Sequence, residues 1–497
     1  MYSGSGFNEW EIGDITVIIH NGVYHLFHLI IPNHDYIAHA VSKDGMSWRR
    51  TKNALFVGDP GDWDDDMLWT MDVREDKGKF IMYYTGLARR DRGIISRVGF
   101  AVSDDLIEWR KTDKPALFIE PPGIYYECRK DNPRKWLSFR DPFRFDYNGD
   151  TYLVVCARRN EGPISRRGCA GLIKLKDDGA EFLPPLIYPM AYDDIECPCV
   201  FELHGRFYLL GSIREDIKVR YWFAPEFLGE YHSFHSDVVL PLGNYAARTV
   251  QDGSHLLVFN FFYAGTVDRL RVLPPPKQFD TDDKGRLLLK TYYRWQQMVT
   301  GQVLQHEIKE VACLFNNPTA SLFLNDNKWV CGSRSGYEVF YFKKPSTAFI
   351  WEGRINVEGM GKLGIVTDID KDGNGYYISF DVSNGVVKIR TWGYNPNNDR
   401  SNFIFNDIQS NLFKVNEDRS FHFSLLSYGN YIEVSVDGIV KLTLIDYTYS
   451  GEYIGLYSAS SVISLQEAVI KILPQPEEEY ASQEETQKTI EAKRDVL

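Results

Sequence analysis

Hydrophobic and polar residues alternate along the first 300 residues in five similar hairpin patterns. Each is an extended run, a turn that carries a glycine, and a second run rich in aromatic or aliphatic residues. The turn glycines lie about 50–70 residues apart, which is the length of a four-stranded blade with its loops. Dipeptides such as Asn-Gly and Asp-Gly permit the positive φ angles that tight hairpins need. The pattern predicts five blades, with turn glycines at Gly22, Gly78, Gly149, Gly205 and Gly253.

From residue 301 the strands follow a different rhythm. Short alternating runs such as GYYISFDV and SFHFSLLSY recur with turns between them, at the spacing of about 8–12 residues that is typical of a two-sheet sandwich. The last 23 residues are polar and charged, which favours an unfolded tail. We therefore predict an all-β protein with a five-bladed β-propeller (1–300), a β-sandwich (301–474) and a charged tail (475–497).

Three acidic residues take similar positions in this repeat. Asp14 and Asp141 lie eight residues before their turn glycine and Glu196 lies nine before, whereas blades two and five have Thr70 and Tyr245 at the eighth position. The innermost strands of a propeller line its central channel, so the three carboxylates should meet at one channel mouth. Mutual repulsion there should raise at least one pKa. The alternative is that each acid caps a strand or pairs with an arginine independently.

A cluster of this kind suits glycoside hydrolysis. One carboxylate attacks the anomeric carbon or activates water, and a second, kept protonated by its surroundings, donates a proton to the leaving oxygen. Further candidates for sugar binding are Trp69 and Asp72, near the mouth in blade two, and His28 and His39, through blade one. Each also has a structural alternative, since a rim tryptophan or a hydrogen-bonded core histidine needs no ligand.

Composition narrows the class of partner. The net charge of −12 disfavours binding to nucleic acid or to an anionic membrane. Seven scattered cysteines indicate neither a disulfide framework nor a zinc site, and Asp368–Gly375 resembles a calcium loop but has Ser379 where the last glutamate ligand would lie. We expect no metal and no organic cofactor, and a carbohydrate as the partner. Homo-oligomerisation is left open.

The N-terminal residues show no basic and apolar regions like those of a signal peptide. No apolar run reaches the length of about 18 residues that indicates a membrane span. We therefore expect a cytoplasmic protein, unless a leader has been removed.

Two tripeptides connect the pattern to a known family. Arg140-Asp141-Pro142 and Glu196-Cys197-Pro198 resemble the Arg-Asp-Pro and Glu-Cys-Pro motifs of glycoside hydrolase family 32, the invertases, inulinases and levanases. The blade-one segment from Asp14 to Phe27 and the stretch His39–Asp44 with Trp48 are also similar to that family. The resemblance implies the same layout, a propeller followed by a sandwich.

The resemblance also implies residue roles and a reaction. Asp14 would be the nucleophile, Glu196 the general acid/base and Asp141 the stabiliser of the transition state, with Arg140 orienting the carboxylates. The reaction would be hydrolysis of β-fructofuranosides with retention of anomeric configuration, with transfer to another sugar as a side activity. Gly13 stands where the family has asparagine, and the family's following Pro-Asn-Gly is absent, so we expect an altered sugar pocket.

Three alternatives remain open. An inverting propeller hydrolase of arabinosides or xylosides would separate its carboxyl groups by about 6.5–9.5 Å, against about 5–5.5 Å for a retaining enzyme. A propeller phosphorylase would need basic residues around the pocket, for which Arg140, Arg158, Arg159, Arg166 and Arg167 are available. A non-catalytic carbohydrate-binding protein would bind sugar without turnover.

Overall fold

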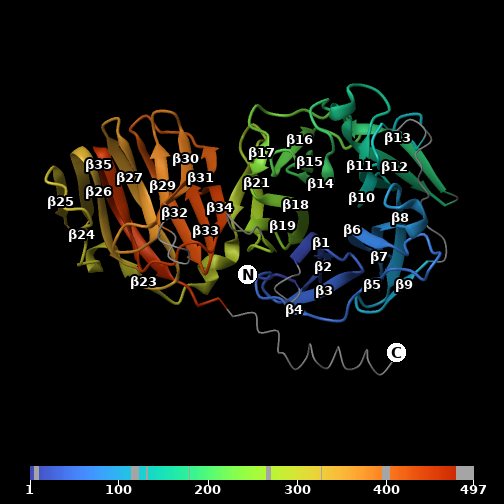
Figure 1. The fold of residues 1–497 in the computed structure, drawn as a ribbon, viewed down its shortest axis with the longest axis horizontal. Coiled ribbons are helices and arrows are strands. Elements are labelled where there is room, and N and C mark those ends of the chain that lie inside the picture. Colours follow the sequence, from blue (N-terminus) through green and yellow to red (C-terminus); the bar gives the residue numbers. More distant parts are fainter. Residues whose placement is uncertain are drawn as a thin grey trace.

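The computed structural model confirms the predicted all-β architecture of a five-bladed propeller followed by a sandwich (Figure 1). It describes residues 1–4, 11–112, 123–129, 133–177, 179–264, 270–325, 327–394 and 403–476. The predicted charged tail lies, from residue 477 on, outside these residues. Among the described residues, regular helix is limited to 3₁₀ segments of three to six residues, and no helix is long and apolar enough to cross a membrane.

Five antiparallel sheets form the propeller, on the right in Figure 1, and each corresponds to one predicted blade. Blade one contains β1 (Glu11–His20), β2 (Val23–Ile31), β3 (Tyr36–Ser42), β4 (Arg49–Arg50) and β5 (Leu55–Phe56). Blade two contains β6 (Met67–Asp76), β7 (Lys79–Leu87), β8 (Ser96–Ser103) and β9 (Trp109–Lys111). Blade three contains β10 (Phe139–Tyr147), β11 (Asp150–Arg158), β12 (Gly168–Lys176) and β13 (Gly179–Ile187).

The other two blades follow the same order from the channel outward. Blade four contains β14 (Glu196–Leu203), β15 (Arg206–Ile213), β16 (Lys218–Ala224) and β17 (Val238–Leu240). Blade five contains β18 (Asn244–Asp252), β19 (His255–Ala264), β20 (Leu270–Val272), β21 (Lys277–Thr281) and β22 (Leu287–Thr291). The chain start closes on this last blade, because Leu273 N–H donates to the Tyr2 carbonyl at 2.9 Å.

The inner strand of every blade carries a β-bulge close to its start. Register shifts fall between Ile12 and Ile15, Trp69 and Met71, Arg140 and Phe143, Glu196 and Cys199, and Tyr245 and Arg248. Such a bulge adds one residue to one strand and redirects its side chain. The same device therefore recurs five times around the channel mouth.

The bulge residues align when they are counted from the first residue of the hairpin turn. Asp14, Thr70, Asp141, Cys197 and Ala246 each precede that residue by seven positions. Glu196 comes one position earlier.

The turn glycine is a poorer reference point. In blade five, Gly253 is the first turn residue and has φ +57°, whereas in the other four blades the glycine comes second, after a residue that also has positive φ. Only the first central residue of a type II′ turn needs positive φ, whereas a type I′ turn needs it at both. Alignment on the glycine therefore placed Tyr245 opposite Thr70 wrongly, because Tyr245 corresponds to Arg140 and Glu196.

The second domain, on the left in Figure 1, is a sandwich whose two sheets share long strands. Its first strands are β23 (Gly301–Leu304), β24 (Ala312–Cys313), β25 (Ala320–Leu324), β26 (Lys328–Lys343), β27 (Ala348–Glu358) and β28 (Lys362–Ile369). The remaining strands are β29 (Gly375–Asp381), β30 (Val386–Tyr394), β31 (Phe403–Leu412), β32 (Ser420–Tyr428), β33 (Tyr431–Val436), β34 (Ile439–Ile445) and β35 (Tyr453–Ile472).

β35 links the two layers of this domain. Its first half pairs with β28 and its second half with β27, and Ser460, with φ +57°, lies between the two halves. At the opposite side the Gln409 amide accepts from Thr443 N–H at 2.8 Å and donates to the Thr443 carbonyl at 2.8 Å and the Leu242 carbonyl at 2.6 Å. Gln409 thus joins the edges of the two sheets to each other and to the propeller.

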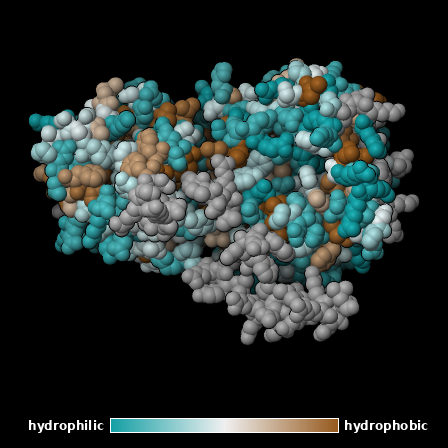
Figure 2. Space-filling model, viewed as in Figure 1, coloured by the Kyte–Doolittle hydropathy of each residue, from teal (hydrophilic) through white to brown (hydrophobic). Residues whose placement is uncertain are grey.

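Burial follows the predicted alternation. Inner faces of both domains are packed with aliphatic and aromatic side chains, and Trp295, which has no exposed surface, packs between the domains against Tyr428 at a ring distance of 4.8 Å. The face of the molecule seen in Figure 2 is mostly hydrophilic, with small separate hydrophobic areas on each domain. The core therefore fixes the blades rigidly around the channel mouth.

Candidate active site

A pocket at the channel mouth is lined by all three predicted acids. Its volume is about 360 Å³, and blades one to four contribute to its wall. The lining residues are Asp14, Trp69, Leu87, Gly93, Ser96, Trp136, Leu137, Arg140, Asp141, Glu196 and Arg214. Asp14 and Glu196, which are 182 positions apart in the sequence, thus line the same pocket, as the blade repeat predicts.

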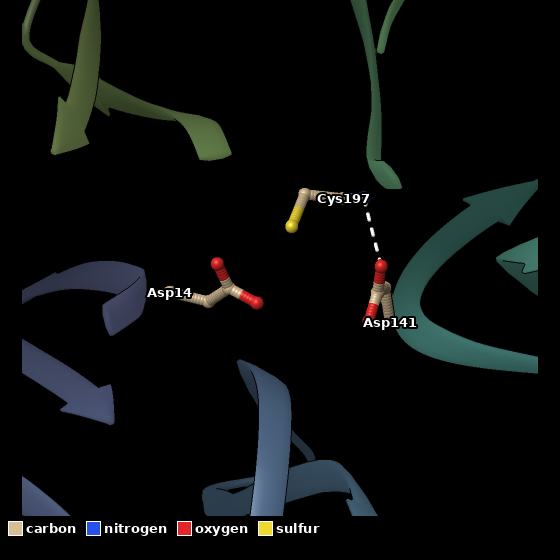
Figure 3. Close-up of side chains that lie close together, drawn as sticks. All are labelled: Asp14, Asp141 and Cys197. Carbon is tan, nitrogen blue, oxygen red and sulfur yellow. Dashed lines mark hydrogen bonds between the residues drawn. The ribbon is translucent and has the colours of Figure 1, made fainter. Parts of the chain in front are cut away.

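Asp14 and Asp141 face each other across the centre of this pocket. Oxygens of their carboxylates and the Cys197 sulfur lie within 4.8 Å of one another (Figure 3). The Thr70 hydroxyl donates a hydrogen bond to Asp14 Oδ2. Asp14 therefore approaches the pocket from blade one, with one of its carboxylate oxygens anchored by blade two.

Asp141 is held from two sides by the bulges. Its own N–H donates to Thr85 Oγ1 at 3.1 Å, and Cys197 N–H donates to Asp141 Oδ2 at 3.0 Å, the dashed line in Figure 3. Burial raises the pKa of Asp141, nearby Arg140 opposes this effect, and the Asp14 charge adds to it. The left-handed φ of +60° at Asp141 turns the side chain into the pocket.

Glu196 accepts hydrogen bonds from two side chains, one on each of its oxygens. Arg140 Nη2 donates to Glu196 Oε1 at 2.7 Å, and the Tyr245 hydroxyl donates to Oε2 at 2.5 Å. Its side chain is 15% exposed. Burial raises the pKa of Glu196, Arg140 lowers it and the Asp141 charge raises it again. The net upward direction favours the protonated form that a general acid needs.

Arg140 is fixed by a second buried acid. Asp194 Oδ2 accepts from Arg140 Nη2 at 3.1 Å and from Ser138 Oγ at 3.0 Å. Asp194 has almost no exposed surface. Burial of a guanidinium requires such a partner, because an uncompensated buried charge is costly. Asp194 therefore orients the arginine that bridges to Glu196.

Asp14, Asp141 and Cys197 are also arranged closely enough to share a cation. Burial raises the pKa of the Cys197 thiol well above its usual value, with the two carboxylates adding to the effect. A metal ion would have to displace the thiol proton. It would also compete for the carboxylate oxygens with the Thr70 hydroxyl and the Cys197 N–H. These donors suit a site that reacts through its carboxylates.

The structure brings Trp69 to the pocket but not the two histidines or Asp72. Trp69 lies in the wall, with Arg140 Cζ 6.0 Å from its ring centre. Asp72 is buried deeper in the channel, where it accepts from Arg74 Nε and from Arg144 N–H, both at 2.9 Å. Asp72 therefore joins blades two and three and is not part of the pocket wall.

His28 and His39 are fully buried inside blade one. Tyr2 OH lies 2.8 Å from His28 Nε2, and His25 Nδ1 lies 3.0 Å from His39 Nε2. The His39 ring also stacks on Phe27 at 4.4 Å. Both histidines have protein partners in the core and neither lines the pocket, so their position corresponds to the structural alternative.

Four residues at the site were not among the predicted ones: Asp194, Tyr245, Arg214 and Trp136. The strand pairing within blade four could have predicted the positions of two of them, Asp194 and Arg214. Glu196 pairs with Ser212 across β14 and β15, so the residues just before Glu196 and just after Ile213 must lie at the same mouth. Tyr245 would have followed from counting blade five from the first turn residue.

Comparisons with known proteins agree with this geometry. Residues 14–255 match the model of the glycosyl hydrolases family 32 N-terminal domain. A fructan 1-exohydrolase IIa structure from Cichorium intybus superimposes with a TM-score of 0.66 at 14% identity, covering 93% of this chain and 95% of that one. Fold and site therefore define a five-bladed propeller with a carboxylate-lined pocket and an appended β-sandwich. Over residues 14–255 the propeller is a divergent form of the glycoside hydrolase family 32 N-terminal domain.

Sequence relatives cover shorter stretches. A 6(G)-fructosyltransferase from Asparagus officinalis is 27% identical over 250 residues, 46% of this chain and 38% of that protein. A 1,2-beta-oligomannan phosphorylase from Thermoanaerobacter sp. (strain X514) is 28% identical over 194 residues, 34% of this chain and 64% of that protein. The chain thus aligns with less than two thirds of either relative.

Proposed function

We propose that the protein hydrolyses β-fructofuranosides by a retaining double displacement and can also transfer the fructosyl group to another sugar. The observation that carries the proposal is that Asp14, Asp141 and Glu196 line one pocket. Asp14 attacks the anomeric carbon, Glu196 protonates the leaving oxygen and then deprotonates water or an acceptor sugar, and Asp141 binds hydroxyls of the reacting ring.

The surroundings of each acid support these roles. Asp14, the proposed nucleophile, accepts a hydrogen bond from Thr70 and faces Asp141 across the pocket. Glu196, whose pKa is raised by burial, retains its proton more readily than an exposed glutamate. The match to the family 32 domain and the relationship to a fructosyltransferase favour a fructoside as the substrate.

The test is a hydrolysis screen on sucrose, inulin and levan with the wild-type chain and with Asp14→Asn and Glu196→Gln. Each substitution should lower kcat by at least about 10²–10⁴-fold, whereas Asp104→Asn, at an exposed acid with a 57% exposed side chain, should leave it unchanged. NMR of the first-formed fructose should show the β-anomer. The α-anomer would indicate inversion, and binding without turnover would indicate a non-catalytic protein.

Phosphorolysis is a second candidate, favoured by the relationship to an oligomannan phosphorylase and by two arginines, Arg140 and Arg214, in the pocket wall. The blade-three arginines contribute less than the sequence suggests. Arg158 is buried and bonded to Glu127 and Asp193, and Arg167 also bonds Glu127. Glycosyl phosphate formed in phosphate buffer, at a rate that rises with phosphate concentration, would identify this reaction.

A further inference from the structure

Arg214 is the half-exposed cation of the pocket. It follows directly after β15, lines the cavity, and has a side chain that is 56% exposed. Its nearest acids are Asp193 Oδ2 at 3.5 Å and Glu196 Oε1 at 3.8 Å. Within the described residues its guanidinium makes no hydrogen bond, although it carries five N–H donors.

Arg140 lines the same pocket but is buried and already hydrogen-bonded. Its side chain is 7% exposed, and one nitrogen already donates to both Asp194 and Glu196. Arg140 is therefore committed to holding the acids, whereas the donors of Arg214 are available to a ligand. A solvated guanidinium beside a pocket gains most when a ligand replaces its water with well-placed acceptor oxygens.

The position of Arg214 indicates which part of a substrate it would meet. In the proposed reaction, the oxygen of the leaving group must lie within hydrogen-bonding reach of Glu196. Atoms attached to that oxygen then extend past Glu196, where Arg214 Nη1 is 3.8 Å from Oε1. In the same reaction the fructosyl ring would lie between Asp14, which attacks it, and Asp141, which binds its hydroxyls.

Trp136 gives the same pocket a second feature of a sugar subsite. It lies in the wall, is 41% exposed and has Arg134 Cζ 4.8 Å from its ring centre. An exposed aromatic ring and the half-exposed guanidinium of Arg214 in one pocket suit a ligand that has both C–H faces and hydroxyl oxygens. This combination describes a sugar better than a small alcohol.

We infer that Arg214 binds the leaving-group sugar and determines specificity for it, with Trp136 in the wall of the same pocket. The inference rests on the proposed function. Since an acceptor sugar must approach the fructosyl-enzyme along the path by which the first leaving group departed, Arg214 also selects the acceptor in transfer. Water needs no such contact, so loss of Arg214 should shift the balance toward hydrolysis.

The experiment compares two fructosyl donors that differ only in the leaving group: sucrose, which releases a sugar, and β-fructosyl fluoride, which releases fluoride. For Arg214→Ala, kcat/KM on sucrose should fall about 10- to 100-fold, mainly through KM, while kcat/KM on the fluoride changes less than about threefold. Arg214→Lys should retain part of the sucrose activity. Arg354→Ala, at a sandwich arginine of similar exposure (51%), is the matched control and should change neither.

The outcomes separate the possible roles. An equal fall on both donors, together with a displaced alkaline limb of the pH–rate profile, would mean that Arg214 acts through Glu196 and overturns the inference. Unchanged kinetics on both donors would also overturn it. A wild-type chain that turns over neither donor contradicts the proposed function, whereas an active wild type with an unselective Arg214→Ala contradicts this inference alone.

Discussion

The hydroxyl of Tyr245 donates a 2.5 Å hydrogen bond to Oε2 of Glu196 and so connects blade five to the acid of blade four. Blade five carries no acid at its bulge, where Ala246 lies. Its contribution to the pocket is this donor, which lowers the pKa of Glu196 against the larger upward effect of burial.

We expect Tyr245→Phe to move the alkaline limb of the kcat/KM profile to higher pH. The general acid must be protonated, so activity is lost as pH rises through the pKa of Glu196, and removing a donor to the carboxylate raises that pKa. Rate profiles between pH 4 and about 10 measure the limb. Tyr263→Phe, next to Tyr245 at a ring distance of 6.1 Å, is the control. A limb displaced toward lower pH would contradict the assignment of Glu196.

Thr70→Val should lower kcat by roughly 10- to 100-fold. The substitution keeps the side-chain volume but removes the hydroxyl that donates to Asp14 Oδ2, and a hydrogen bond to a charged group is worth about 1.5–3 kcal/mol. Thr70→Ser, which keeps the donor, should retain most of the activity. Steady-state kinetics on the best fructoside measure kcat. A Thr70→Val variant as fast as wild type would show that Asp14 does not need the hydrogen bond from Thr70.

The buried histidines of blade one should make the protein sensitive to acid. Burial lowers the pKa of His28 and of His39 to about 3. The unfolded chain therefore binds protons from about pH 6.5 downward while the folded chain does not, so folding free energy is lost as pH falls from about 6.5 toward 3.

Urea unfolding of the protein at several pH values tests this effect. Each of His28→Gln and His39→Gln should reduce the slope of unfolding free energy against pH by up to about 1.4 kcal/mol per pH unit in that window. Loss of stability at neutral pH is expected as well, so the slope is the diagnostic quantity. His235→Gln, at an exposed position, should leave the slope as in wild type. Parallel slopes for all variants would refute the prediction.

Gln409→Leu should destabilise the sandwich by about 1–3 kcal/mol. It leaves the Thr443 N–H and two carbonyls, of Thr443 and Leu242, without their amide partner in a buried setting. The shift in the thermal midpoint of the sandwich measures the effect, with Gln302→Leu at an exposed position of β23 as the control. Equal thermal midpoints for Gln409→Leu and Gln302→Leu would show that the Gln409 amide does not stabilise the sandwich.

Sequence alone reached the architecture because one hairpin signal is repeated. Each turn dipeptide ending in glycine marks a blade, and Asp14, Asp141 and Glu196 could be located by counting back from it. Counting failed at Tyr245, where a II′ turn moves the glycine by one residue. It could not show the burial of His28, since a short alternating strand looks the same whether its partner covers it or not.

Long-range pairs were beyond the reach of pattern reasoning. Asp194 contacts Arg140 across 54 positions of the chain, and Arg214 reaches the pocket only because β15 runs back to the mouth beside β14. Neither residue lies at a repeated position, so no periodicity marks it. Hairpin register places both residues at the channel mouth, but the partners they meet there depend on how blades three and four are arranged in space.

The bulge that recurs at the start of every inner strand has a consequence for how such a pocket diversifies. The backbone provides five equivalent bulge positions around one opening, occupied by Asp14, Thr70, Asp141, Cys197 and Ala246. A single substitution can change the side chain at one bulge position while the main chain of the neighbouring blades stays in place. The set of reactive side chains can therefore change one position at a time on the same fold. This is compatible with the fold that the chain shares with the Cichorium intybus structure at 14% identity.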